Sequence, residues 1–326
     1  MKTATKVWLV IATSLVLIGC IIWGGVMTML QWDFTKLSTV QYETNEHEII
    51  EAFQHISISA DTANIVFVPS ENETASVICH EQENMKHNVS VENDTLVIQV
   101  KDTRKWQDHI GIHFGKPKIT VYLPQSEYGV LWVRSSTGDI TIPREFRFKS
   151  MDISQSAGNV TCFASASDTV KIKTTTGDIH VENISAGSLE LSLSTGKMTV
   201  SNVECSGDLT ITASTGKTRL TDVKCKNLIS NGTTGGISIK NVIATEKFHI
   251  VRNTGDVTFE HADAAEIYVK TSTGDVTGSL MTQKDFIVAS SSGKIDVPNT
   301  SGIGKCQIST STGDIILTVE SYITLS

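Results

Sequence analysis

Aspartate is the residue that could carry chemistry most regularly in this chain, because it repeatedly follows a glycine. Asp139, Asp178, Asp256, Asp275 and Asp314 each complete a Thr-Gly-Asp turn. Carboxylates that lie close together could bind a divalent cation, or could supply the paired acid and base of a glycosidase. Asp256 and Asp275 form the best pair, since they fall on consecutive repeats and neighbouring strands lie about 5 Å apart.

Both chemistries need more than this pair. Calcium takes about six to eight oxygen ligands, and the flanking positions, Gly236 and Lys294, supply no side-chain oxygen. A glycosidase also needs a cleft, and none of the five tryptophans lies after Gly138. We therefore interpret the aspartates as turn residues. We predict no catalytic residue, no cofactor and no metal site.

The cysteines allow two interpretations. Cys205 and Cys225 each fall nine residues after a repeat glycine, so they could stack within disulfide reach. The same position holds Ala186, Ala244 and Ala264 in other repeats, which indicates a small buried site where a thiol acts as an apolar group. Both interpretations stay open at this point.

The nine histidines are scattered along the chain. His109 and His113 are four residues apart, a spacing that suits a metal only on a helix. Gly111 and Pro117 argue against a helix there, so we interpret Asp102–Lys116, which also contains Trp106, as a loop.

A repeat of 19 or 20 residues must position all of these side chains. In most copies, apolar residues occur five and seven positions before the repeat glycine and two and four positions after it, which predicts two short strands joined by a tight turn. A lone hairpin of this size cannot bury its apolar face, whereas stacked coils can. The ten copies fall at Gly138, Gly158, Gly177, Gly196, Gly216, Gly235, Gly255, Gly274, Gly293 and Gly313.

The chain is therefore expected to be all-β, with a β-solenoid of about ten 19–20-residue coils over residues 131–326. The crossover rule for parallel strands predicts a right-handed coil. Two polar ladders should run along its axis. One is formed by the threonine before the glycine in eight of the ten copies, and the other by Asn183, Asn202, Asp222 and Asn241 at a second corner.

The N-terminus carries an uncharged apolar run over residues 7–30, long enough to cross a bilayer as one helix. Lys2 and Lys6 precede it, so residues 1–6 should be a cytoplasmic tail and the C-terminal domain should be extracytoplasmic, in a single-pass protein of the plasma membrane. Alternatives are a cleaved signal peptide or a lipoprotein attached through Cys20, because Leu17–Cys20 is similar to a lipobox. Residues 31–52 are polar and are expected to form a stalk or linker.

Alternating residues from Ile56 onward predict further strands, among them Ala75–Cys79, Val89–Val91, Leu96–Val100 and Ile119–Leu123. Their spacing is irregular, which is typical of a cap that covers the exposed strand edges of a solenoid. We therefore assign residues 53–130 to an N-terminal β cap.

The order of motifs is distinctive. Residues 60–65 (Ala-Asp-Thr-Ala-Asn-Ile), residues 119–124 (Ile-Thr-Val-Tyr-Leu-Pro) and the train of Ser-Thr-Gly-Asp turns resemble the bacterial "putative adhesin" family of unknown function, including its membrane-anchored LiaG-like members. The resemblance covers residues from about Phe53 to the C-terminus. It implies a β-solenoid domain and, for some members, association with cell-envelope stress operons. It implies no activity and no catalytic residues.

The leading hypothesis is a membrane-anchored structural or interaction protein of the bacterial cell envelope, adhesin-like and not an enzyme. Its partners would be the membrane, through the N-terminal helix, and a cell-wall polymer or an envelope protein. The net charge of −8 argues against a nucleic-acid partner. The alternatives are a regulatory binding module in an envelope-stress response and a carbohydrate-active enzyme.

Overall fold

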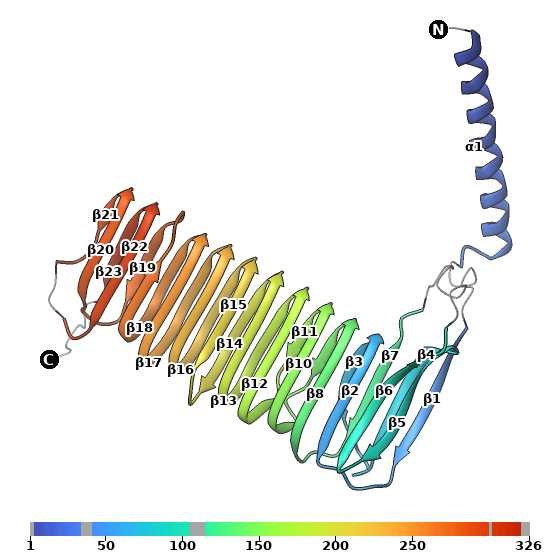
Figure 1. Ribbon diagram of the computed structural model, residues 1–326, viewed down its shortest axis with the longest axis horizontal. Helices are drawn as coiled ribbons and strands as arrows, with labels where there is room; N and C mark the ends of the chain where they lie inside the picture. Colours follow the sequence, from blue (N-terminus) through green and yellow to red (C-terminus); the bar gives the residue numbers. More distant parts are fainter. Residues whose placement is uncertain (1–2, 34–40, 105–114, 300–301, 321–326) are drawn as a thin grey trace.

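The computed structural model describes residues 3–33, 41–104, 115–299 and 302–320. Strands make up 68% of it and helix 8%, so the chain is all-β apart from one N-terminal helix. The strands stack into a β-solenoid of about nine turns, with a β cap between the coils and the helix (Figure 1). The predicted fold class is confirmed, while the right-handed winding stays a prediction.

The elements of the helix and cap are α1 (Thr3–Met29), β1 (Tyr42–Ile49), β2 (His55–Thr62), β3 (Asn64–Pro69), β4 (Ala75–Gln82), β5 (Met85–Glu92), β6 (Thr95–Asp102) and β7 (Lys118–Leu123). Those of the coils are β8 (Glu127–Thr137), β9 (Ile140–Ile142), β10 (Arg147–Ala157), β11 (Val160–Cys162), β12 (Ser165–Thr176), β13 (Ile179–Thr195), β14 (Met198–Cys205), β15 (Leu209–Thr215), β16 (Thr218–Thr234), β17 (Ile237–Thr254), β18 (Val257–Lys270), β19 (Val276–Leu280), β20 (Asp285–Ser292), β21 (Ile295–Asp296), β22 (Lys305–Thr312) and β23 (Ile315–Val319).

The core consists of columns of apolar side chains that run through the coils. In β10, Met151 and Ile153 lie opposite Leu131 and Val133 of β8 in parallel register. All four are at most 1% exposed. Burial of one such side chain contributes about 1.5–3 kcal/mol. Because every coil repeats the pattern, the apolar positions predicted from the period hold the stack together.

The repeat glycine is the first corner of each coil. All ten copies have positive φ, between 121° and 154°. At Gly274 a Cβ atom would lie 2.3 Å from the carbonyl oxygen of Gly255 in the adjacent coil. Both the φ value and this close approach require glycine, which explains the strictness of the period.

Within the cap the parallel pairing changes to antiparallel pairing. β2 and β3 still pair in parallel with β8 and β9, whereas β4 pairs antiparallel with both β1 and β7, and β5 pairs antiparallel with β6. β1 therefore brings residues 42–49 into the cap, within the stretch for which the sequence predicts a stalk. That strand was missed because its half-buried inward positions include Asn45 and His47, which give no apolar alternation.

The last coils do not stack in sequence order. β22 pairs with β18 on one side and β20 on the other, and β23 lies between β19 and β21 in the same way. Residues 305–319 are thus inserted between two earlier segments, as Figure 1 shows at the end away from the helix. Within the described residues, β20 and β21 pair on one side only, so they and not β23 form the outer edge.

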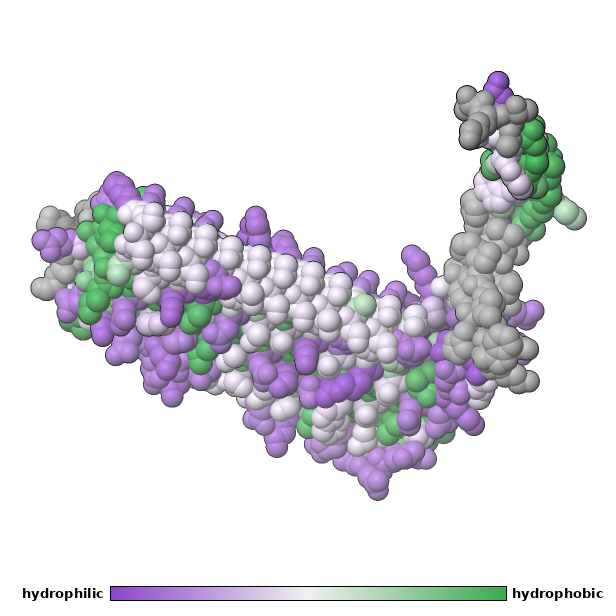
Figure 2. All heavy atoms as spheres, turned by 45° about the horizontal axis from the view of Figure 1, so that its top comes forward, coloured by the Kyte–Doolittle hydropathy of each residue, from purple (hydrophilic) through white to green (hydrophobic). Residues whose placement is uncertain are grey.

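The hydropathy of the surface differs between the coils and the end of the solenoid away from the helix. Figure 2 shows a flat strip of intermediate hydropathy along the coils, bordered by hydrophilic side chains, and hydrophobic side chains at the end away from the helix. Serine, threonine and glycine, the residues of the turns, have this intermediate hydropathy. At the outer edge, Ile287 is 54% exposed and Ile295 is 43% exposed.

Helix α1 projects from the cap end (Figure 1). Residues Thr5–Met29 have a mean hydropathy of 2.4, and none of the most apolar window is buried against the rest of the chain. By length and composition this helix could cross a membrane or act as a signal sequence.

Candidate functional site

The aspartates of the Gly-Asp turns form a ladder of side-chain to backbone hydrogen bonds. Oδ1 of Asp256 accepts the backbone N–H of Asp275 at 3.0 Å, and Oδ1 of Asp275 accepts that of Asp314 at 2.8 Å. Oδ1 of Asp314 then accepts the backbone N–H of Lys294 at 2.7 Å. Each carboxylate therefore satisfies an N–H of the adjacent coil, which is a structural task at a turn.

The inserted coil changes the neighbours that the sequence predicts for these aspartates. Asp275 lies next to Asp314 and not next to Lys294, so three carboxylates follow one another along the stack. They do not converge on one point. Among the described residues, the group of three or more potential metal ligands within 4.8 Å of one another lies elsewhere, in the cap. The absence of a metal site at these turns stays a prediction.

The second predicted ladder lies at the other corner of the coils. Asn202 donates to Oδ1 of Asn183 at 3.0 Å, and Asn241 donates to Oδ1 of Asp222 at 2.8 Å. All four residues have φ between 51° and 57°, the left-handed conformation that Asn and Asp tolerate. His261 occupies the same corner in the next coil with φ of 52°. The threonines before the glycines stack in register and are exposed, but no side-chain hydrogen bond joins them in the described residues.

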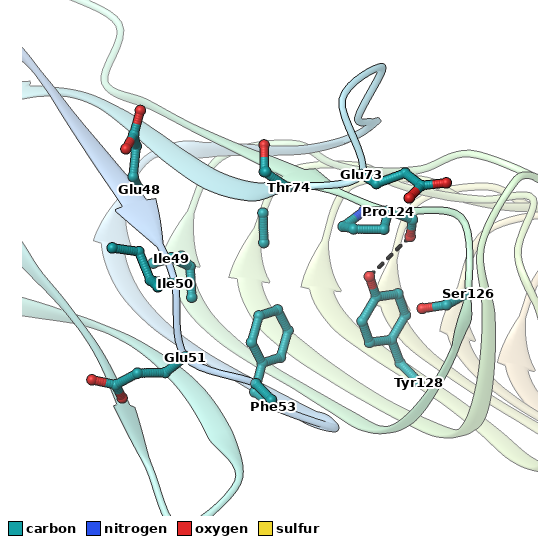
Figure 3. A pocket seen from close by; sticks show the side chains of 12 residues that line it. Glu48, Ile49, Ile50, Glu51, Phe53, Glu73, Thr74, Pro124, Ser126 and Tyr128 are labelled. Atoms are coloured by element: carbon teal, nitrogen blue, oxygen red, sulfur yellow. Dashed lines mark hydrogen bonds between the residues drawn. The ribbon is translucent and has the colours of Figure 1, made fainter.

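A depression of about 500 Å³ opens at the start of the cap (Figure 3). Its apolar part is made by Phe53 and Tyr128, whose rings stack with centroids 6.0 Å apart, and by the end of β1 at Ile49. The phenol of Tyr128 donates to the carbonyl of Pro124 at 2.9 Å, and burial raises its pKa. Tyr128 is therefore a fixed, neutral wall of the depression.

Carboxylates surround this apolar part. Glu48, Glu51 and Glu73 line the depression and are exposed. An apolar surface ringed by carboxylates suits an apolar group that carries a positive charge, such as a lysine side chain or an aminated sugar. The sequence prediction missed this place because its residues come from three separate segments, 48–53, 73–75 and 124–128, which no sequence pattern links.

The cysteines of the strands are unbridged thiols in this structure. Cys205 is 4% exposed and Cys225 is 3% exposed, in the column that also contains Ala186 and Ala244. Burial raises the pKa of both thiols to about 12, so neither is a ready nucleophile at neutral pH. The interpretation as small apolar side chains is the one that the structure supports. Trp106, His109 and His113 lie outside the described residues.

The cap contains one buried cluster of reactive side chains that the sequence analysis did not identify. Glu81 on β4 and His87 on β5 form a buried pair, with Oε2 2.7 Å from Nδ1 and each side chain 1% exposed. Cys79, two residues before Glu81 and on the same face of β4, completes the group. Burial, with a smaller contribution from the charge of Glu81, raises the pKa of the Cys79 thiol to about 12. The signal available in the sequence was the Cys-x-Glu spacing on one strand with a histidine on the next.

The chain matches the model of one protein family, Toastrack DUF4097, over residues 53–216 and 204–324. These residues contain every strand except β1. A comparison with curated proteins finds no match.

Three solved structures illustrate what the chain is similar to. A "putative lipid binding protein" from Parabacteroides distasonis ATCC 8503 is 18% identical, with a TM-score of 0.49 over 74% of this chain and 98% of that one. A "putative adhesin" from the same organism is 12% identical, with a TM-score of 0.41 over 84% and 98%. Another from Bacteroides fragilis NCTC 9343 is 14% identical, with a TM-score of 0.36 over 85% and 97%.

Proposed function

Because this chain belongs to the Toastrack DUF4097 family, we propose that it is a membrane-anchored interaction protein of the bacterial cell envelope. It acts in an adhesin-like way, by binding and without catalysis. Helix α1 spans the plasma membrane once, with residues 1–6 in the cytoplasm and the solenoid outside. The cap and coils present binding surfaces to a cell-wall polymer or an envelope protein.

The observation that carries this proposal is the combination of an unburied apolar helix with a stiff β-solenoid. A helix whose most apolar window is unburied leaves that surface for lipid, and 25 residues are enough to cross the hydrocarbon core. Lys2 and Lys6 before the helix favour a cytoplasmic N-terminus. Repeat solenoids typically use their extended surfaces for binding.

The depression at Phe53 and Tyr128 is the binding place that we propose within this function. Its carboxylates, together with the net charge of −8, favour a partner that carries positive charge. Two observations support a non-catalytic role. The aspartates of the ladder accept backbone N–H groups, and the thiols of the strands are buried.

The anchor is tested in cells. The full chain should stay with the membrane fraction after alkaline washing, a variant lacking residues 1–30 should not be retained there, and protease added outside the cell should remove the solenoid. A soluble mature chain that starts after residue 30 would indicate a signal peptide instead. A lipid-modified N-terminus at Cys20 would indicate a lipoprotein.

Binding is tested with the full chain in lipid nanodiscs, incubated with isolated cell wall, anionic vesicles or a detergent extract of envelope proteins. We expect retention by wall polymer or by one envelope protein. The double variant Glu51→Lys, Glu73→Lys should weaken it, while Glu127→Lys, outside the depression, should not. If neither wall polymer nor an envelope protein retains the chain, the proposed function is refuted. If the retained protein is a regulatory membrane protein, the envelope-stress alternative is favoured.

A further inference from the structure

The cluster of Cys79, Glu81 and His87 is closed off from water and held by two strands. The three residues are 0%, 1% and 4% exposed. They come from the hairpin of β4 and β5, so the two strands fix their positions relative to one another. One donor atom from each residue lies within 4.8 Å of the other two.

The hydrogen bonds of Glu81 leave one coordination position open. Its Oε2 accepts the backbone N–H of His87 at 2.6 Å and Nδ1–H at 2.7 Å, and its Oε1 accepts from Asn45 at 2.8 Å. An ionised carboxylate offers about four lone-pair sites, so these three donors leave one free. The carboxylate is thus both an orienting group and a potential ligand.

Only one nitrogen of the His87 ring has a hydrogen-bond partner. Nδ1 lies 2.7 Å from Oε2 of Glu81, while Nε2 is buried with no hydrogen-bond partner. A metal ion held by both residues takes the place of the proton between Nδ1 and Oε2, so Nδ1 is the nitrogen that coordinates it and the ring proton moves to Nε2.

Unsatisfied polar atoms gather in this part of the molecule. Eight buried side-chain N or O atoms lack a partner in the described residues, and four belong to β1 and the β4–β5 hairpin: His47, Gln82, Asn84 and His87. Gln82 and Asn84 contribute side-chain oxygens, so acceptors without a donor lie directly after Glu81 in the chain. A cation can satisfy such acceptors, and β1, which carries His47, pairs with β4 so that Asn45 lies opposite Cys79.

We propose that Cys79, Glu81 and His87 bind a zinc ion. A thiolate, an imidazole nitrogen and a carboxylate oxygen form a typical zinc set, and three protein ligands leave a fourth position for water or a further side chain. Binding replaces the thiol proton of Cys79 by the Zn–S bond, and that proton passes to the solvent. The ion would join β4 to β5 and so fasten the antiparallel end of the cap, independently of any binding partner.

The test uses the full chain in nanodiscs, treated with a chelator and then titrated with Zn²⁺ by calorimetry. We expect one ion per chain, release of a proton, and a higher melting temperature of the zinc-loaded protein. Cys79→Ser and His87→Gln should each lower the affinity more than about 10-fold. Cys162→Ser, which alters a buried thiol far from the cluster, is the matched control and should leave the affinity unchanged.

Titration of the unaltered chain with Co²⁺ keeps the proposal testable if a variant fails to fold. A thiolate ligand gives Co²⁺ an intense sulfur-to-metal charge-transfer absorption, and this band should be lost in Cys79→Ser. The proposal is overturned if the unaltered chain takes up no Zn²⁺. It is also overturned if Co²⁺ binds without the charge-transfer band, since the ion would then sit elsewhere.

Discussion

Arg252 on β17 carries a charge inside the coils, and its removal should stabilise the protein. Its side chain is 2% exposed at a position that the other coils fill with uncharged residues. Nη2 donates to Oγ of Ser230 at 2.7 Å, while Nε has no partner. No ion pair within the described residues involves this guanidinium. Burial consequently lowers the pKa of Arg252 to about 10.

The free-energy cost follows from that pKa. A fall from 12.5 to about 10 corresponds to roughly 3 kcal/mol against the protonated folded state at neutral pH. The folded pKa is the lower one, so this cost is fully present below pH 10 and disappears as the pH rises toward 12.5. Arg252→Leu removes it but leaves the Ser230 hydroxyl without its donor, which costs about 1 kcal/mol. The net expectation is a stabilisation of about 2 kcal/mol at pH 7.

Hydrogen exchange in increasing urea is the suitable assay, because coils of a solenoid can unfold separately and a single melting temperature mixes them. Protection of the amides of β16 and β17 should rise in Arg252→Leu. Arg219→Leu, which removes an exposed arginine from β16, is the control and should change protection by less than about 0.5 kcal/mol. A loss of protection in Arg252→Leu would refute the reasoning, since it would mean that the guanidinium stabilises the coils.

Gly232, which lies against the side chain of Arg252, provides a second variant. A Cβ atom there would lie 1.6 Å from Nη1 of Arg252. Gly232→Ala should therefore destabilise the coil by about 1–3 kcal/mol. In the Arg252→Leu background most of that loss should vanish, and a double-mutant cycle measures the difference. Additive effects would show that the guanidinium is not what the alanine meets.

Three shorter predictions concern the turns and thiols. Asp275→Ala should lower the unfolding free energy by about 1 kcal/mol because the N–H of Asp314 loses its acceptor, whereas Asp275→Asn should be nearly neutral in the same urea titration. Gly274→Ala should lower the unfolding free energy by more than about 2 kcal/mol, because alanine would be strained at φ 149° and its Cβ would overlap Gly255. A change below about 0.5 kcal/mol would contradict the role given to this glycine. Burial raises the pKa of Cys162 to about 12, so iodoacetamide at pH 8 should alkylate it only after unfolding, as mass spectrometry would show.

The repeating coil could be predicted because its first corner accepts only glycine. Each repeat glycine adopts positive φ with a neighbouring carbonyl against it, so the period in the sequence is the period of the stack. The second corner was equally visible, since Asn183 and Asn202 adopt the left-handed conformation that their types suggest. His261 was missed at this corner because histidine is a less frequent choice there.

The stacking order of the last coils could not be predicted. Residues 285–296 and 305–319 both carry a repeat glycine, in Ser292-Gly293 and Thr312-Gly313, and the same apolar alternation, so either segment can pair with β18 and β19. In the structure the N–H of Asp285 donates to the carbonyl of Gly304, and β22 takes the place beside β18. The cluster proposed to bind zinc could not be predicted from the sequence for a similar reason. Cys79 and His87 meet through the hairpin and not through a spacing on one element.

The inserted coil has a consequence for how the chain is made. Residues 285–296 leave the ribosome before residues 305–319, yet their partners in the final stack, β22 and β23, belong to that later segment. Synthesis can therefore complete the coils progressively only as far as about residue 280. The end of the solenoid then forms in one step once the chain is released. We expect a released chain truncated after residue 300 to expose residues 281–300 to protease, although the coils before them are folded. A repeat added after residue 319 would likewise have to leave from inside the stack, so this end is closed to growth by duplication.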